Sequence, residues 1–175
     1  MDKEERDFNQ NELKELEDAV LIAEELVSNY YKMSSTQWFK SRYDIKTLKE
    51  LKPEEIVDGP FAQVLGYEAK KQDGAVSISA MNYYNVCFQD SAILRKIAQN
   101  SELMLLPFLV YITVHELVHI VRFSKFEQRY LASSEAQCAM EEERKVHQIT
   151  ASILKGVQIS GIDAVINYYH EWLIN

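Results

Sequence analysis

The sequence predicts an α+β protein that is mainly α-helical, with long helices and a small antiparallel β-hairpin or sheet before its most apolar helix. Two observations support this class. The 175 residues include only 5 Gly and 3 Pro, too few for the regular turns of a β-sandwich or barrel. Several long segments repeat apolar residues at helical spacing, whereas one segment alternates apolar and polar residues around an Asp-Gly pair.

Composition narrows the classes of function. With 47% hydrophobic residues and no linker or repeat, residues 1–175 are expected to form one domain. The net charge of −8, with Lys and Arg scattered, argues against a nucleic-acid partner. We find no signal peptide, no CxxC pair and no apolar stretch long enough for a bilayer, so we expect a cytoplasmic protein without a membrane partner. The strongly polar residues 1–10 are expected to be disordered.

The first half of the chain predicts two kinds of element. Residues 11–32 repeat apolar side chains at helical spacing and predict an amphipathic helix, and residues 33–59 predict one or two short helices. Residues 61–88 predict a β-hairpin, because strict alternation follows Asp73-Gly74. A hairpin alone is marginally stable, so it must pack on helices or gain a third strand. Asn82 falls on its core face, which indicates a bulge or a functional polar group.

Four more helices follow the hairpin. They are predicted at about residues 90–100, 105–124, 134–156 and 162–173. Asp90 is the expected N-cap of the first. The helix at 105–124 is apolar on nearly all sides, so it is expected to be buried, with Pro107 in its first turn.

The buried helix carries His115-Glu116-Leu117-Val118-His119, which is an HExxH motif. Residues i and i+4 lie one turn apart on the same helix face, so both imidazoles can bind one metal ion. Glu116 is adjacent without occupying a ligand position, which suits a general base. Histidines in such an apolar helix can also be hydrogen-bonded core residues without a metal, an alternative that the motif makes the weaker one.

The third metal ligand is not fixed by the motif. A metzincin would need Gly and His where this chain has Arg122 and Lys125, so that class is excluded. The remaining choice is a carboxylate on the next helix, where Glu141, Glu142 and Glu143 stand in a row. Glu142 and Glu143 both border the inward-facing stripe, whereas Glu141 lies further round the helix and is expected to be solvated.

Residues 105–157 resemble the gluzincin metallopeptidases, in particular the small ImmA/IrrE-like group. The resemblance rests on HELVH with its uncharged flanks and on EEERKVHQITASIL downstream. It implies a zincin-like fold and a Zn²⁺ ion held by His115, His119 and Glu143, with Glu143 three residues before the small apolar Val146. Glu142 stays the alternative ligand.

Four residues after its ligand Glu, the thermolysin-like branch has an Asp that holds a metal-binding histidine, and here that position is His147. A neutral imidazole can accept the same N–H, so we assign His147 a catalytic supporting role, with substrate orientation or an ordinary histidine as alternatives. Arg122 either binds a substrate carboxylate or pairs with one of the three glutamates, and we favour pairing.

Peptidases of this kind also need a hydrogen-bond donor for the developing oxyanion. The candidates are Tyr83, Tyr84, Tyr130, Tyr168, Tyr169 and His170. In the zincins that the sequence resembles, a strand before the active-site helix binds extended peptide, and here residues 77–88 occupy that place. Asn82 on this strand is a candidate contact to the substrate backbone.

These residues predict a zinc-dependent peptidase that hydrolyses a peptide or protein substrate with a metal-activated water and Glu116 as base. The alternative is a non-catalytic metal-binding or regulatory module on the same scaffold. A metal-free helical interaction protein is a weaker third hypothesis. Nothing in the sequence indicates the substrate or the oligomeric state.

Overall fold

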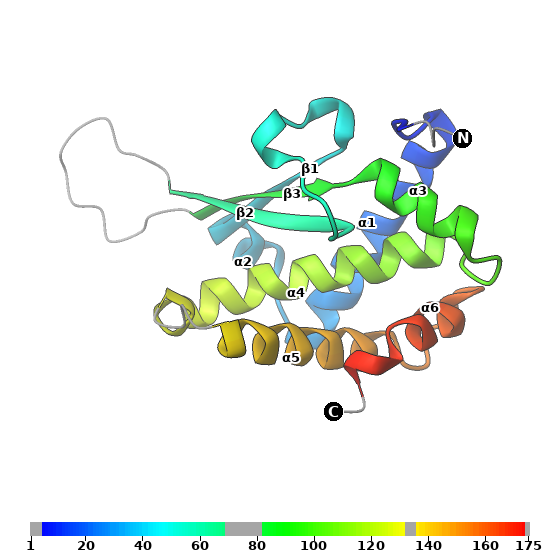
Figure 1. The fold of residues 1–175 in the computed structure, drawn as a ribbon. Coiled ribbons are helices and arrows are strands. Elements are labelled where there is room, and N and C mark those ends of the chain that lie inside the picture. Colours follow the sequence, from blue (N-terminus) through cyan, green and yellow to red (C-terminus); the bar gives the residue numbers. More distant parts are fainter. Residues whose placement is uncertain (1–4, 69–81, 132–135, 174–175) are drawn as a thin grey trace.

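The structure is a computed structural model that describes residues 5–68, 82–131 and 136–173 (Figure 1). It is α+β and mainly helical, as the sequence predicts. The helices are α1 Gln10–Tyr31, α2 Ser35–Lys40, α3 Asp90–Gln99, α4 Leu105–Leu131, α5 Ala136–Leu154 and α6 Ile162–Tyr168. The strands are β1 Ser41–Lys46, β2 Ala62–Glu68 and β3 Asn82–Phe88, and the short 3-10 turns are η1 Leu48–Glu50, η2 Pro53–Glu55 and η3 His170–Trp172.

The sheet has three strands in the order β1-β3-β2. Strands β2 and β3 pair antiparallel, with Ala62 opposite Phe88, which confirms the pairing expected within residues 61–88. The expected Asp73-Gly74 turn lies outside the described residues. Strand β1 pairs parallel with β3, so the sheet is mixed rather than purely antiparallel.

Strand β1 corrects the expectation that residues 33–59 hold only short helices. The segment contains the short helix α2, but Ser41–Lys46 continues from it as a strand. Its alternating pattern involves only two half-buried apolar side chains, Tyr43 and Ile45, which is too short a signal to recognise from sequence. The strand supplies the third partner that the hairpin needs for stability.

Helix α4 is the central element of the fold, between the sheet and α5 (Figure 1). Residues 107–121 of this helix are all buried. Its segment Leu105–Ser124 is long and apolar enough to cross a membrane, but 83% of that window is buried inside the protein. Helix α1 packs along α4 through the fully buried Ala19, Ala23 and Val27, whose small side chains repeat every four residues.

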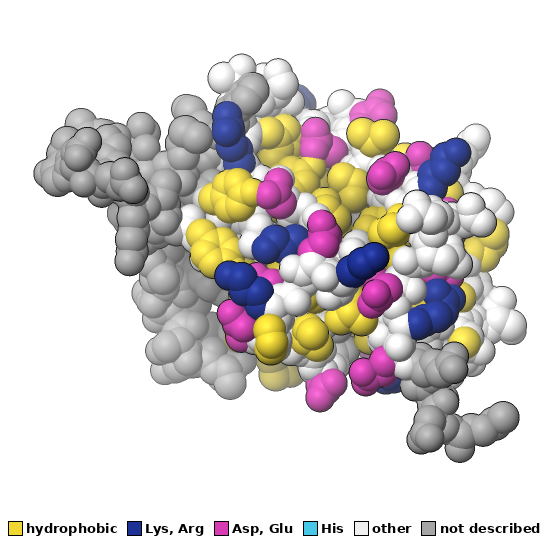
Figure 2. Space-filling model, turned by 90° about the horizontal axis from the view of Figure 1, so that it is seen from above, with side chains coloured by type: hydrophobic (Ala, Val, Ile, Leu, Met, Phe, Trp, Pro, Cys, Tyr) yellow, Lys and Arg dark blue, Asp and Glu magenta, His cyan; other side chains and the backbone are white. Residues whose placement is uncertain are grey.

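Charge is mixed on the face seen from above the sheet (Figure 2). Acidic and basic side chains are interspersed there among hydrophobic ones, and no histidine is visible among the described residues. The basic side chains visible on this face therefore form no single patch.

Residues 5–10 pack against the rest of the protein, so the expected disorder of residues 1–10 is wrong for the described part of that segment. Phe8 is only 6% exposed, and its N–H donates to Asp90 Oδ2 at 2.9 Å. The other oxygen of Asp90 accepts from the N–H of Leu48 at 3.0 Å. Asp90 is also not the N-cap of α3, a position held by Gln89. The buried carboxylate instead joins three segments that are distant in sequence.

We expect Asp90→Ala to lower the free energy of unfolding by about 2–4 kcal/mol, because it leaves two backbone N–H groups without their charged acceptor. Urea unfolding followed by circular dichroism measures the change. Asp18→Ala, on the exposed side of α1, is the control and should change stability by less than about 0.5 kcal/mol. Equal effects of the two substitutions would contradict the assigned role of Asp90.

Candidate metal centre

The two motif histidines lie together on the inner face of α4. His115 and His119 are each 8% exposed, and their Nε2 atoms are 3.2 Å apart. The helix brings them together because the four-residue spacing advances the chain by about one turn. Both Nδ1 atoms are buried and have no hydrogen-bond partner among the described residues. The two rings therefore form one small polar site on the face of an otherwise apolar helix.

Helix α5 brings a carboxylate to both histidines. Glu143 Oε2 lies 3.2 Å from His115 Nε2, and Glu143 Oε1 lies 2.8 Å from His119 Nε2. Glu142 faces Arg122 instead, with the guanidinium donating to both of its oxygens at 2.5 and 3.0 Å. Glu141 is exposed. Of the three adjacent glutamates, the structure thus brings Glu143 to the histidines and gives Arg122 the pairing role.

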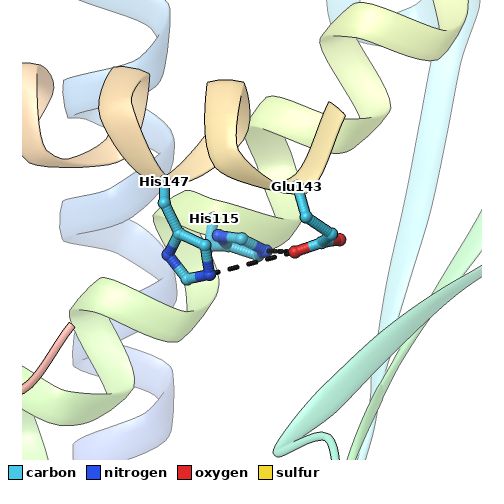
Figure 3. Close-up of side chains that lie close together, drawn as sticks. All are labelled: His115, Glu143 and His147. Carbon is cyan, nitrogen blue, oxygen red and sulfur yellow. Dashed lines mark ion pairs between the residues drawn. The ribbon is translucent and has the colours of Figure 1, made fainter. Parts of the chain in front are cut away.

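His147 lies one turn beyond Glu143 on α5 and faces the same site (Figure 3). Its Nε2 is 3.9 Å from Glu143 Oε2, and the ligand atoms of His115, Glu143 and His147 lie within 4.8 Å of one another. Its Nδ1 shares a hydrogen bond of 2.8 Å with the Tyr111 hydroxyl. This differs from the expected support of a metal-binding histidine, because the ring is held by Tyr111 and can itself act as a ligand.

The donor set could hold a metal ion. A tetrahedral ion with ligands at about 2.0–2.1 Å requires ligand atoms roughly 3.3–3.4 Å apart. His115 Nε2 lies 3.2 Å from His119 Nε2 and 3.2 Å from Glu143 Oε2, and His119 Nε2 lies 2.8 Å from Glu143 Oε1. The two imidazole nitrogens and the two carboxylate oxygens are therefore already gathered almost at that spacing. Two imidazole nitrogens and one carboxylate oxygen are also the ligand types of a three-residue zinc site.

The electrostatics of the site differ among its imidazoles. For His119, burial is outweighed by the hydrogen bond to Glu143 and the nearby carboxylates of Glu116 and Glu142, which raise the pKa. Burial lowers the pKa of His115, and burial together with the neighbouring His115 lowers the pKa of His147 to about 3. Burial opposes ionisation of Glu143, but hydrogen bonds from His115 and His119 outweigh it and hold its pKa well below the ordinary value. Glu116 is 7% exposed and has no such donors among the described residues, so burial raises its pKa to about 8.

The centre opens into a cleft of about 930 Å³. One wall is formed by residues 59–64, which lead into and begin the edge strand β2, and another by α3. Of residues 77–88, expected to bind a peptide by edge pairing, the described part is β3, and it is the central strand. The expectation is therefore wrong for this part, and the edge strand beside the cleft is β2. The side chain of Asn82 lies outside the described part of the structure.

The candidates for an oxyanion donor differ in whether they line the cleft. Tyr168 and Tyr169 line the cleft. Tyr83 is hydrogen-bonded to Asp44, and Tyr84 is buried and stacks on Phe123.

Two other candidates do not contribute to the described cleft. His170 is exposed and does not line it, and the side chain of Tyr130 is not described. Tyr169 is closest to the centre, since its ring stacks on Tyr111 at 4.2 Å and lies 5.1 Å from His147.

Two residues of the site were not identified from the sequence. Tyr111 lies four residues before His115 on the same helix face, a spacing that could have indicated its contact with the site. Trp172 stacks on His147 at 4.9 Å. No local pattern indicates that contact, because η3 reaches α5 only through tertiary folding.

Glu116→Gln tests the burial of the motif carboxyl in metal-free protein. The folded pKa of about 8 exceeds the ordinary 4.5, so ionisation of Glu116 makes stability fall as pH rises from about 4.5 to about 8. Gln is neutral throughout. We expect the variant to be more stable than the wild type by a few kcal/mol at pH 8, and the gap to shrink toward pH 5. Urea unfolding in a chelator measures it.

The matched control is Glu102→Gln, since Glu102 is exposed. A gap of the same size for both variants, or one that is constant between pH 5 and 8, would contradict the buried state of Glu116.

Comparison of this chain with family models, curated proteins and solved structures finds no match. The site combines two imidazoles and a carboxylate at ligand spacing, a buried glutamate beside them, and a cleft with an edge strand along one wall.

Proposed function

We propose that the protein is a zinc-dependent peptidase similar to the small, ImmA/IrrE-like gluzincins. One observation carries the proposal: the HExxH side chains of α4 and Glu143 of α5 converge at the bottom of a cleft that β2 borders. A peptidase requires this combination, since the cleft must admit an extended chain at the point where the ligands meet.

In this function His115, His119 and Glu143 hold the ion. A bound Zn²⁺ supplies Lewis acidity toward a peptide carbonyl and toward water. Glu116 accepts the proton of the attacking water and delivers it to the leaving amine. The positive charge of the ion lowers the pKa of the nearby Glu116 carboxyl, so the base is expected to be ionised in the metal-loaded protein.

The cleft supports binding of an extended peptide along β2. An edge strand has unpaired backbone groups on one side, and a peptide can add to them as a further strand. Tyr169 is the candidate donor for the carbonyl oxygen, because it lines the cleft next to His147. We further propose a cytoplasmic location, with α4 acting as a core helix rather than a membrane span.

A second candidate function is supported by His147. If His147 Nε2 occupied the fourth position on the ion, the site would be closed, as in structural metal sites, and the protein would bind metal without hydrolysis. The hydrogen bond between His147 Nδ1 and the Tyr111 hydroxyl is compatible with this arrangement, since a metal-binding histidine donates its other ring N–H to an acceptor, here the hydroxyl oxygen.

Measurements of zinc affinity test whether Glu143 or Glu142 is the third metal ligand. We expect Glu143→Gln to lower zinc affinity by more than about 100-fold, because it removes a charged ligand. The matched change Glu142→Gln should lower it by less than about fivefold, since Glu142 contacts Arg122. Competition against a chromogenic chelator measures both. A large loss in both variants would contradict the assignment of Glu143.

The same assay on His147→Ala distinguishes the two functions. An open catalytic site keeps its zinc affinity within about tenfold, whereas a closed site loses affinity as strongly as Glu143→Gln does. His170→Ala is the control because His170 is exposed.

Activity is tested on a library of amidated peptides whose products are identified by mass spectrometry. Glu116→Gln should keep its zinc and lose at least about 100-fold in cleavage rate, since it removes the proton acceptor. Glu102→Gln should cleave like the wild type. Full cleavage by a zinc-loaded Glu116→Gln protein would show that Glu116 is not the base.

A further inference from the structure

Two basic side chains line the cleft away from the metal centre. Arg95 and Lys96, from the last turns of α3, are cleft-lining residues. Within the part of the chain that the structure describes, neither forms an ion pair with a carboxylate. In a protein of net charge −8, two unpaired cations that face one cleft are a concentrated positive charge.

A row of aromatic rings links these cations to the centre. Lys96 Nζ lies 5.7 Å from the centre of the Tyr168 ring. The Tyr168 ring is 4.9 Å from that of Tyr169, which is 5.1 Å from the ring of His147. A peptide that reaches the metal centre along this wall therefore also passes Lys96.

The other charges on the cleft wall are acidic. Glu116 and Glu143 belong to the metal centre, and Glu171 lines the cleft beside Trp172. Glu143 is a ligand and is neutralised by a bound cation. Arg95 and Lys96 are thus the described groups of the cleft that can attract an anionic side chain of a peptide.

The position of α3 relative to β2 indicates which end of a bound peptide lies near Arg95 and Lys96. Helix α3 starts beside the beginning of β2, where the N–H of Gln89 donates to the carbonyl of Phe61 at 2.8 Å. A peptide paired antiparallel with β2 runs in the opposite direction, so its C-terminal part lies at the α3 end. Antiparallel pairing is also the more stable arrangement per residue.

We propose that the cleft selects peptides that carry Asp or Glu on the C-terminal side of the scissile bond, with Arg95 and Lys96 as the specificity-determining residues. The inference rests on the proposed peptidase function, because it assigns a substrate class to that same site. Each exposed ion pair strengthens binding about two- to fivefold, so two cations are expected to give a preference of roughly fivefold or more.

The experiment measures binding and cleavage separately. Zinc-loaded Glu116→Gln protein is titrated with fluorescein-labelled, amidated peptides that differ only in Asp-Glu against Asn-Gln in their C-terminal half. We expect about fivefold tighter binding of the acidic peptides at 50 mM salt, and a smaller difference at 0.5 M salt. Wild-type protein is given a degenerate amidated library, and the cut sites are read by mass spectrometry.

Charge reversal provides the matched variants. Arg95→Glu/Lys96→Glu should favour peptides with Lys or Arg in the same positions. The control Lys49→Glu/Lys52→Glu makes the same change in net charge on exposed residues outside the cleft and should keep the acidic preference.

Each outcome separates the two proposals. Cleavage without an acidic preference, or with acidic residues enriched on the N-terminal side, overturns the specificity inference and leaves the peptidase function standing. Acid-selective binding that the charge reversal abolishes, together with no cleavage by zinc-loaded wild type, overturns the peptidase function but supports the role of Arg95 and Lys96.

Discussion

The contact of Glu143 with two buried imidazoles is the interaction on which the site and the packing of α5 against α4 depend. Burying His115 and His119 in an apolar helix costs free energy unless their polar atoms find partners. Glu143 supplies one carboxylate oxygen to each ring, Oε2 to His115 at 3.2 Å and Oε1 to His119 at 2.8 Å. Its neighbour Glu142 adds a two-point contact to Arg122 on the same pair of helices. The polar faces of α4 and α5 therefore specify how the two helices are aligned.

The rest of the fold leaves one side of this contact open. Helix α1 covers another side of α4 through its small residues, and all three strands of the mixed sheet contact α4. Since β1 pairs with one side of β3, β2 pairs with the other and becomes the edge next to the histidines. The C-terminal residues complete the enclosure, because Tyr169 and Trp172 cover His147. The result is a cleft that brings the His and Glu side chains of the centre together with residues of β2, α3 and the C-terminal aromatic cluster.

Local sequence patterns predicted the helices well, because the spacing of apolar residues that indicates a helix lies within the helix itself. Residues 105–124 are apolar on nearly all sides, and a helix with that composition has to be buried. The HExxH spacing likewise determines that His115 and His119 meet, since it depends only on the helix repeat. Strand β1 and the order of residues 5–9 were missed because both depend on partners far away in sequence, namely β3 and Asp90.

The sequence by itself determined the fold class, the central apolar helix and the pair of histidines, because helix periodicity and burial are properties of neighbouring residues. Only the tertiary structure distinguished Glu143 from Glu142, since both border the same helix stripe and the position of Arg122 across the interface separates them. It also made β2 the edge strand that borders the cleft and brought the ring of His147 to 4.3 Å from that of His115 on the other helix. These outcomes depend on how α4, α5 and the sheet pack, which no single segment of the chain encodes.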